Sequence, residues 1–239
     1  MAMTFLTPGQ LLVSFVVVAM AALAWLFFSP LPETTSRPLD LGTTIGPLTS
    51  RRIAALGEDG PGCRAALDRV GIAYRPLPSR VEPEACAVEN GIAWATGGTR
   101  ESRYAPAAPV LACPLAAGLA LWEWNIVQPA AVALLGSPVV RIDHFGSFAC
   151  RRIYGRASGA WSQHSRARAI DIAGFDLADG RRITVASDWA ADNPESRFLH
   201  RIRDGACRVF GTTLSPDYNA AHRDHLHLDE AHTGWSICR

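Results

Sequence analysis

Two short stretches place the strongest constraint on the fold, because their chemistry is complete only if they meet in space. The first is Ser162–Asp171 (SQHSRARAID) and the second is His222–Asp229 (HRDHLHLD). Together they hold four of the seven histidines of the chain. The second stretch alternates, and this pattern predicts a strand with His225, His227 and Asp229 on one face. A fold that brings the two stretches together would gather these side chains at one site.

These residue types are typical of a zinc site. Catalytic zinc takes three protein ligands from His, Asp or Glu and keeps one position for water. His164 and Asp171 are seven residues apart, too far to be neighbours on one strand, but a loop-to-strand bend could turn both inward. His225 and His227 share a strand face, so only a group from elsewhere is needed to complete a site. Asp224 is a local carboxylate that could orient an imidazole or take protons. Either motif alone is more typical of a structural role.

The charge balance argues against a nucleic-acid partner. The 239 residues carry 23 basic and 22 acidic side chains, a formal net charge of +1. This balance gives no electrostatic footprint for binding a phosphate backbone. A nuclease of the HNH type, built on Asp224 and His225, is disfavoured for the same reason. No Asn and second His follow that pair at a suitable spacing.

Six cysteines are scattered along the chain and none forms a Cys-x-x-Cys pair, so a zinc ribbon or a thioredoxin-like motif is disfavoured. An even, scattered set fits disulfides in an oxidising compartment. Buried free thiols in a cytosolic protein are the alternative. By proximity in sequence alone, we expect the pairs Cys63–Cys86, Cys113–Cys150 and Cys207–Cys238.

The N-terminal segment is hydrophobic. Leu11–Phe28 (LLVSFVVVAMAALAWLFF) is an 18-residue run without a charge, close to the length that a spanning helix needs. No clean cleavage site follows it, so we interpret residues 1–28 as an uncleaved anchor in the inner membrane. Residues 29–50 are rich in Pro, Ser and Thr and are interpreted as a tether. The disulfide argument places the rest of the chain outside the cytoplasm.

The remaining chain is divided into a small α/β lobe over 51–110 and a larger domain over 111–239. In the lobe, 51–70 has helical spacing, and short strands are expected at 72–74 and 92–94. In the larger domain, Pro residues predict helix starts near Cys113 and Pro129, with an end at Gly136. A helix over about 194–210 is expected after the N-cap Asn193. Strands are expected at 139–143, 169–173, 182–185 and 225–229.

The two stretches resemble the motifs of a known enzyme group. The first is similar to the Ser-x-His-x-x-Gly-x-Ala-x-Asp motif of the zinc D-Ala-D-Ala peptidases, a group that includes lysostaphin-like enzymes and the hedgehog fold. Ala167 replaces the usual Gly, and we expect only a slight backbone adjustment there. The second stretch resembles the His-x-x-His-x-His motif of the murein endopeptidase branch. Asp224, three residues before His227, resembles the acidic general base of the D-Ala-D-Ala branch.

Over roughly residues 60–239 the chain more closely resembles the bacterial extensin-like C-terminal domain family. The matching segments are Cys113-Pro-Leu-Ala, Gly146-Ser-Phe-Ala-Cys-Arg151, Ser162-Gln-His164, Asp188-Trp189, Phe198-Leu199 and Pro216–Asp229. The chain has no Ser-Pro-Pro-Pro-Pro repeats of a plant wall extensin. The resemblance implies an α+β fold of the hedgehog/DD-peptidase type, a small antiparallel sheet with flanking helices. Together with the anchor, the expected fold is this domain behind an N-terminal transmembrane helix.

The same resemblance implies roles for single residues. The zinc ligands would be His164, Asp171 and His227. Asp224 or His225 would activate the attacking water, and His222 lies close enough to take part. In the related enzymes an Arg after an earlier strand stabilises the developing oxyanion; Arg151 is the first candidate and Arg152 the second.

The function implied is zinc-dependent hydrolysis of stem peptides or cross-links of peptidoglycan, by an endopeptidase or a carboxypeptidase. A non-catalytic module that binds or organises the cell wall, with a structural metal or none, is the alternative. The two differ at the metal, since a structural site closes with four ligands and needs neither a base nor an oxyanion donor.

Overall fold

The computed structural model describes residues 9, 14–21, 39–79, 84–231 and 236–239, which fall into two units, 1–37 and 38–239. Within these residues, no helix has both the length and the apolar character to cross a membrane. Residues 14–21 are helical, and eight residues span only about 12 Å against the roughly 30 Å of a bilayer core. The prediction of an N-terminal transmembrane helix is therefore wrong for the described residues; the rest of Leu11–Phe28 lies outside them.

The folded unit begins inside the segment that we interpreted as a tether. Leu39 and Leu41 are buried in the hydrophobic core, and α2 (Thr49–Ala55) starts before the end of that segment. The core is continuous from Leu39 to Leu228 and includes residues from both expected parts, 51–110 and 111–239. The two parts therefore share one core in the structure.

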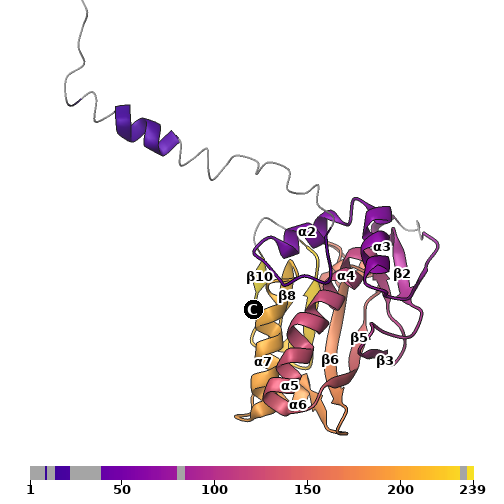
Figure 1. Cartoon of the computed structure of the whole chain (residues 1–239). Helices are drawn as coiled ribbons and strands as arrows, with labels where there is room; N and C mark the ends of the chain where they lie inside the picture. The colour runs from indigo at the N-terminus through magenta and orange to yellow at the C-terminus, as the bar shows by residue number, and fades with distance from the viewer. Residues whose placement is uncertain (1–8, 10–13, 22–38, 80–83, 232–235) are drawn as a thin grey trace, which may run out of the picture. The chain divides into compact units, whose positions relative to one another are not determined.

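The main sheet is mixed and has seven strands in the order β10-β8-β9-β6-β5-β3, with β7 paired to β6 (Figure 1). Its strands are β3 (Arg103–Ala105), β5 (Val139–Gly146), β6 (Ala169–Leu177), β7 (Arg182–Thr184), β8 (Thr212–Leu214), β9 (Leu226–Asp229) and β10 (Ile237–Cys238). The centre is antiparallel, and only the edge pairs β3–β5 and β10–β8 are parallel. The α+β class is confirmed, but the sheet is mixed and has seven strands where a small antiparallel sheet was expected. Its antiparallel centre holds the candidate site.

A smaller sheet is formed by β1 (Tyr74–Pro76), β2 (Gly91–Trp94) and β4 (Val110–Ala112), all antiparallel. The predicted strand at 92–94 is confirmed, whereas the strand expected at 72–74 lies two residues later. The single helix pattern over 51–70 is divided into α2 and α3 (Gly60–Arg69), since Asp59 caps α3 by accepting a hydrogen bond from the Gly62 amide.

Two helical segments cover one face of the main sheet (Figure 1). The first runs without a break through α4 (Cys113–Trp122), the π-helical turn η3 (Glu123–Val127) and α5 (Gln128–Leu135). Pro129 therefore continues a helix where we expected a new one, while the predicted end at Gly136 is confirmed by its left-handed φ of 71°. The second is α7 (Pro194–Ala206), whose predicted N-cap Asn193 accepts from the Ser196 amide at 2.8 Å. Short α6 (Val185–Asp188) precedes it.

Three disulfides join segments that are distant in sequence: Cys63–Cys113, Cys86–Cys150 and Cys207–Cys238. The expected Cys207–Cys238 pair is confirmed, and the other two expected pairs are wrong. Proximity in sequence failed because the packing of α3 on α4 places Cys63 beside Cys113. Cys86, in the short helix η2 (Glu84–Cys86), pairs instead with Cys150, which precedes the first candidate stretch.

Candidate metal centre

The pairing of β6 with β9 brings the two histidine-rich stretches together. Asp171 on β6 is directly opposite His227 on β9. His164 comes from the short helix η5 (Gln163–Arg166), which Ser162 begins by accepting a hydrogen bond from the His164 amide. Ala167 ends this helix with a left-handed φ of 54°, and the chain then turns into β6. The motif thus provides the loop-to-strand bend that places its two ligand candidates side by side.

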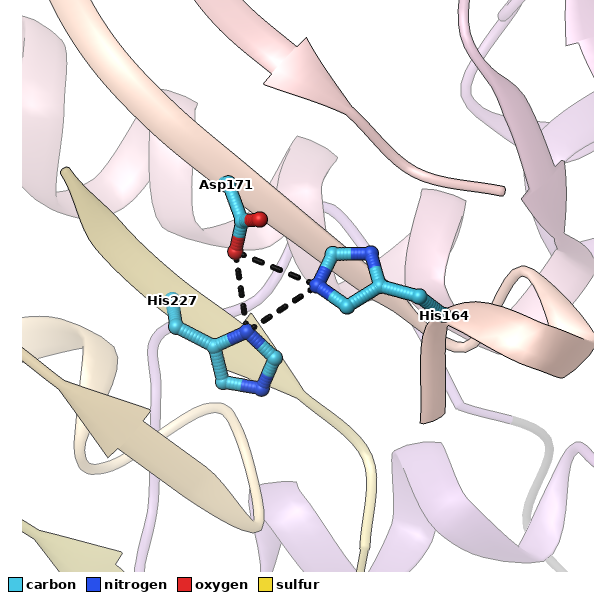
Figure 2. Close-up of side chains that lie close together, drawn as sticks. All are labelled: His164, Asp171 and His227. Atoms are coloured by element: carbon cyan, nitrogen blue, oxygen red, sulfur yellow. Dashed lines mark hydrogen bonds and ion pairs between the residues drawn. The ribbon is translucent and has the colours of Figure 1, made fainter. Parts of the chain in front are cut away.

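Three atoms converge in the centre of this arrangement (Figure 2). His164 Nε2 is 3.2 Å from Asp171 Oδ1 and 3.2 Å from His227 Nδ1. His227 Nδ1 is 2.9 Å from the same carboxylate oxygen. The structure therefore brings together the three residues predicted as ligands, with ligand atoms all within 4.8 Å of one another.

The neighbours of the two imidazoles decide which nitrogens face the centre. His164 Nδ1 donates to the Ser147 carbonyl oxygen at 3.1 Å, since a carbonyl can only accept, and Nε2 is left as a lone pair. The Asp229 carboxylate lies 2.9 Å from His227 Nε2 and can accept its proton, which leaves His227 Nδ1 as the second lone pair. With both rings neutral, two lone pairs and a carboxylate face one another, an arrangement that either an added proton or a bound cation would stabilise.

This donor set fits zinc. Tetrahedral zinc with bonds of about 2.0–2.1 Å separates its ligand atoms by about 3.3 Å. The observed separations of 2.9–3.2 Å lie close to that spacing. Ligating histidines in such sites commonly donate their other N–H to a carbonyl or carboxylate, the role that Ser147 and Asp229 take here.

The electrostatics of the metal-free cluster agree with a cation site. Burial raises the pKa of the Asp171 carboxyl, but its close contacts with the imidazoles of His164 and His227 outweigh this effect and hold that pKa far below its usual range. Burial lowers the pKa of His227, while its contacts with Asp171 and Asp229 overcome this and raise the pKa to about 9. Without metal, a proton on His227 balances the two carboxylates, and a metal ion would displace it.

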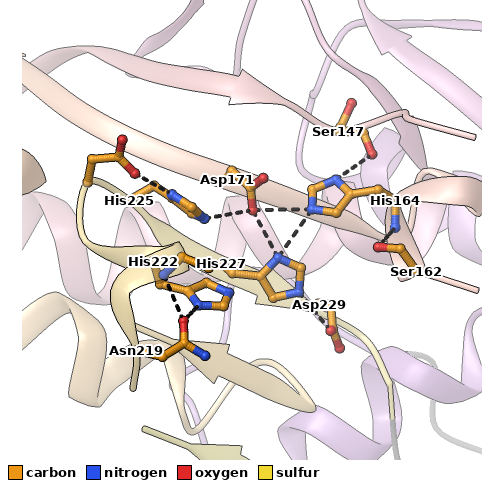
Figure 3. A network of polar contacts seen from close by, with 11 residues as sticks. Ser147, Ser162, His164, Asp171, Asn219, His222, His225, His227 and Asp229 are labelled. Atoms are coloured by element: carbon orange, nitrogen blue, oxygen red, sulfur yellow. Dashed lines mark hydrogen bonds and ion pairs between the residues drawn. The ribbon is translucent and has the colours of Figure 1, made fainter. Parts of the chain in front are cut away.

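A second group of side chains lies beside these three atoms (Figure 3). His225 Nδ1 is 2.9 Å from Asp224 Oδ1, and His225 Nε2 is 3.6 Å from Asp171 Oδ1. Asp224 therefore accepts the Nδ1 proton of His225, so that Nε2 on the side of the centre is free to accept one. His222 packs against His225, with their ring centroids 5.2 Å apart.

His222 is held in one tautomer. Its Nδ1 donates to Asn219 Oδ1 at 2.8 Å, so Nε2 is the acceptor. Burial and the neighbouring His225 and His227 lower the pKa of His222 to about 4, so it is neutral at neutral pH. The three predicted catalytic side chains of the second stretch thus lie together next to the ligand cluster.

The two candidate arginines lie in the loop that follows β5. The Arg151 side chain is exposed and forms no ion pair with a described residue. Arg152 stacks its guanidinium 4.4 Å from the centre of the Trp161 ring and donates to the Gly159 carbonyl. Because these contacts engage Arg152 within its own loop, Arg151 stays the better candidate for contact with a substrate.

Several site residues were not predicted. The Ser147 carbonyl and Asn219 orient His164 and His222, yet neither follows a sequence motif for that role. Asp229 could have been found, since it lies two residues after His227 on the same strand face. Phe145 and Tyr218 pack their rings against His225 and His222 at 5.8 and 5.5 Å.

The other histidines have separate environments. His144 Nε2 bonds to the Ala107 carbonyl, and His200 stacks on Trp189 with ring centroids 4.1 Å apart. His232 lies outside the described residues. The described histidines outside the two stretches therefore do not join the candidate site.

Comparison with known proteins places the chain in one family. No curated protein and no solved structure matches it significantly. The family model described as extensin-like protein C-terminus matches residues 61–239, which cover both histidine-rich stretches, all six cysteines and every strand of the main sheet. The chain therefore belongs to the extensin-like protein C-terminus family.

Proposed function

We propose that this protein is a zinc-dependent hydrolase of peptidoglycan peptides. The observation that carries the proposal is the convergence of His164 Nε2, Asp171 Oδ1 and His227 Nδ1, three Lewis bases with no donor between them except a proton on His227. A zinc ion held there would supply Lewis-acid activation of water and of the scissile carbonyl. Three ligands from the protein leave a coordination position for that chemistry.

The pair of Asp224 and His225 is suited to proton transfer. Asp224 holds the Nδ1 proton of His225 and so presents Nε2 as a base within 3.6 Å of the ligand oxygen of Asp171. As His225 gains a proton from the attacking water, the Asp224 carboxylate stabilises the imidazolium that forms. The proton is then available on Nε2 for the leaving amine.

Two further residues complete the proposed site. His222 stays neutral and accepts through Nε2, so it can orient a water or a substrate N–H without adding charge. Arg151 is proposed to stabilise the developing oxyanion, because its guanidinium keeps its charge and has no partner ion within the described residues.

The substrate class rests on the resemblance of both stretches to the motifs of zinc peptidases that act on the cell wall. The three disulfides support an oxidising compartment, which is where peptidoglycan lies. We therefore propose stem peptides or cross-links of peptidoglycan as substrates, in the periplasm.

The test uses the purified full-length chain with its disulfides intact. We expect about one zinc per chain by elemental analysis, and release of soluble peptides from purified peptidoglycan by mass spectrometry. His164→Ala should lose both, because it removes a ligand. His225→Ala should keep the zinc and lose peptide release, because it removes only the base.

The matched control is His200→Ala, since His200 lies on α7 against Trp189 and away from the centre. It should keep both zinc and peptide release. Zinc bound without any peptide release would favour the non-catalytic module, in which His225 closes the site as a fourth ligand. Absence of zinc at saturating metal would refute the metal centre itself.

A further inference from the structure

A short arm, residues 151–161 (RRIYGRASGAW), projects beside the candidate centre. Its two sides pair at the base, where the Ser162 amide donates to the Arg151 carbonyl and the Ile153 amide to the Ala160 carbonyl. The Cys86–Cys150 disulfide fixes the residue before the arm, and His164 follows shortly after it. The arm is therefore anchored at both ends, and the metal ligand candidate His164 lies three residues beyond one of them.

The arm also contacts the second histidine-rich stretch. The hydroxyl of Tyr154 accepts a hydrogen bond from Asn219 Nδ2 at 3.1 Å, and Asn219 is the residue that orients His222. Tyr154 has a left-handed φ of 57°, a conformation that a bulky residue adopts only at some cost. The contact with Asn219 offsets that cost and holds the arm against the site.

The arm carries a positive charge. No acidic residue occurs within it, and it contains three arginines, Arg151, Arg152 and Arg156. Arg156 lies midway between the two anchored ends of the arm and is exposed. Its guanidinium lies 5.6 Å from the centre of the Tyr154 ring. No ion pair joins Arg156 to another described residue. Since the whole chain has a net charge of only +1, this basic arm is a local feature.

The neighbouring centre contributes carboxylates. Asp171, Asp224 and Asp229 all belong to the site or contact it, whereas the arm contributes guanidinium groups. Peptides of peptidoglycan carry free carboxylates away from the bond that is cut. A guanidinium binds a carboxylate through a planar fork, and an aromatic ring beneath it fixes its orientation.

We propose that this arm is the substrate-binding element of the centre and that Arg156, supported by Tyr154, binds a free carboxylate of the peptide. The inference rests on the proposed function, because it takes its substrate from there. The proposal predicts a specificity: peptides with a free carboxylate should bind more tightly than peptides in which that group is an amide. Arg156 acts in binding and has no part in the proton transfers.

The experiment measures binding in the full-length chain carrying His225→Ala, so that no turnover occurs. The two probes are a soluble muropeptide with free carboxylates and the same muropeptide in amidated form. We expect the acidic probe to bind about 1.5-fold to fivefold more tightly at low salt, the range of an exposed ion pair. This preference should shrink as ionic strength rises.

Arg156→Gln should abolish the preference, and Arg156→Lys should restore part of it, because Lys keeps the charge but loses the fork. The matched control is Arg197→Gln, an exposed arginine on α7 remote in sequence from the arm, which should keep the full preference. Unchanged zinc content in each variant shows that the centre is folded. Equal binding of the two probes, no binding of either, or a preference retained in Arg156→Gln would overturn the proposal.

Failure of this proposal and failure of the proposed function give different results. If the wild-type chain releases no peptide but shows an Arg156-dependent preference, the arm is confirmed as a carboxylate site and the hydrolase proposal fails. If peptides are released and acidic and amidated muropeptides bind equally, the hydrolase stands and the role of Arg156 fails.

Discussion

Glu123 is a fully buried acid in the π-helical turn between α4 and α5, and its replacement tests the energetics of the core. Thr99 donates a hydrogen bond to its Oε1 at 2.6 Å, while Oε2 has no partner among the described residues. Burial raises the pKa of Glu123 to about 7, against smaller lowering effects of the neighbouring Thr99 and Ser102. The folded protein therefore keeps this proton up to about pH 7.

The magnitude follows from linkage between proton binding and folding. The unfolded chain releases the proton near the ordinary pKa of 4.5, so between pH 4.5 and 7 the folded state binds more protons than the unfolded state. Stability contributed by this group is therefore full below pH 4.5 and is lost as pH rises toward 7. At about 1.4 kcal/mol per pKa unit, the loss is roughly 3 kcal/mol.

Glu123→Gln removes this dependence, because the amide has the shape of the neutral acid and does not ionise. We expect the variant and the wild type to have similar free energies of unfolding at pH 4.5. At pH 8 the variant should be more stable by roughly 3 kcal/mol. Urea unfolding of both proteins, with disulfides intact, at a series of pH values gives the difference directly, and titrations common to both cancel.

Two results would refute this reasoning. A stability difference that stays constant between pH 4.5 and 8 would show that Glu123 does not titrate in that range. A difference that changes in the opposite direction would show that the folded state stabilises the carboxylate, so that burial is not the dominant effect. Thr99→Val is the companion variant: it removes the hydrogen bond to Oε1 and should raise the pKa of Glu123 further.

The remaining predictions concern the site and its supports. Asp229→Ala should weaken zinc binding about 10–100-fold in competition with a chelator, because the proton on His227 Nε2 loses its acceptor; unchanged affinity would contradict the role of Asp229. Ala167→Gly should raise the free energy of unfolding by about 0.5–1 kcal/mol, since glycine adopts the left-handed φ of 54° without strain, and a lower melting temperature would count against this account. Replacing both Cys86 and Cys150 by Ser should cost about 4 kcal/mol in urea unfolding, from the 64-residue separation of the pair, and a loss below 1 kcal/mol would show that this disulfide does not constrain the unfolded chain.

Ala167 shows how a motif can be matched while its physical basis is missed. The resemblance predicted Gly at this position and only a slight adjustment for Ala. The structure gives the reason for Gly: the residue ends η5 in a left-handed conformation that turns the chain into β6. Ala tolerates this conformation at a cost, so the bend that brings His164 to Asp171 is retained.

Local signals predicted the helices better than the connections. The caps at Asn193 and Gly136 and the start at Cys113 were predicted correctly, because each depends on a backbone geometry fixed within a few residues. The helix start expected at Pro129 was wrong. The π-helical turn before this proline continues directly into α5, so Pro129 lies within one continuous helical segment. The transmembrane helix was inferred from apolar length alone, and the described helix at 14–21 is too short for that role.

The sequence by itself determined which residue types are present and how each is spaced: the bend between His164 and Asp171, and the alternation that puts His227 and Asp229 on one face of a strand. Only the tertiary structure decided that Asp171 is opposite His227, which imidazole nitrogens face the centre, and which cysteines pair. The physical reason is range. Spacing governs geometry over a few residues. The register of Asp171 against His227 and the pairing of Cys63 with Cys113 depend on how a shared core packs segments that are 50 or more residues apart, and the tautomer of His164 depends on the packing of its ring against the Ser147 carbonyl.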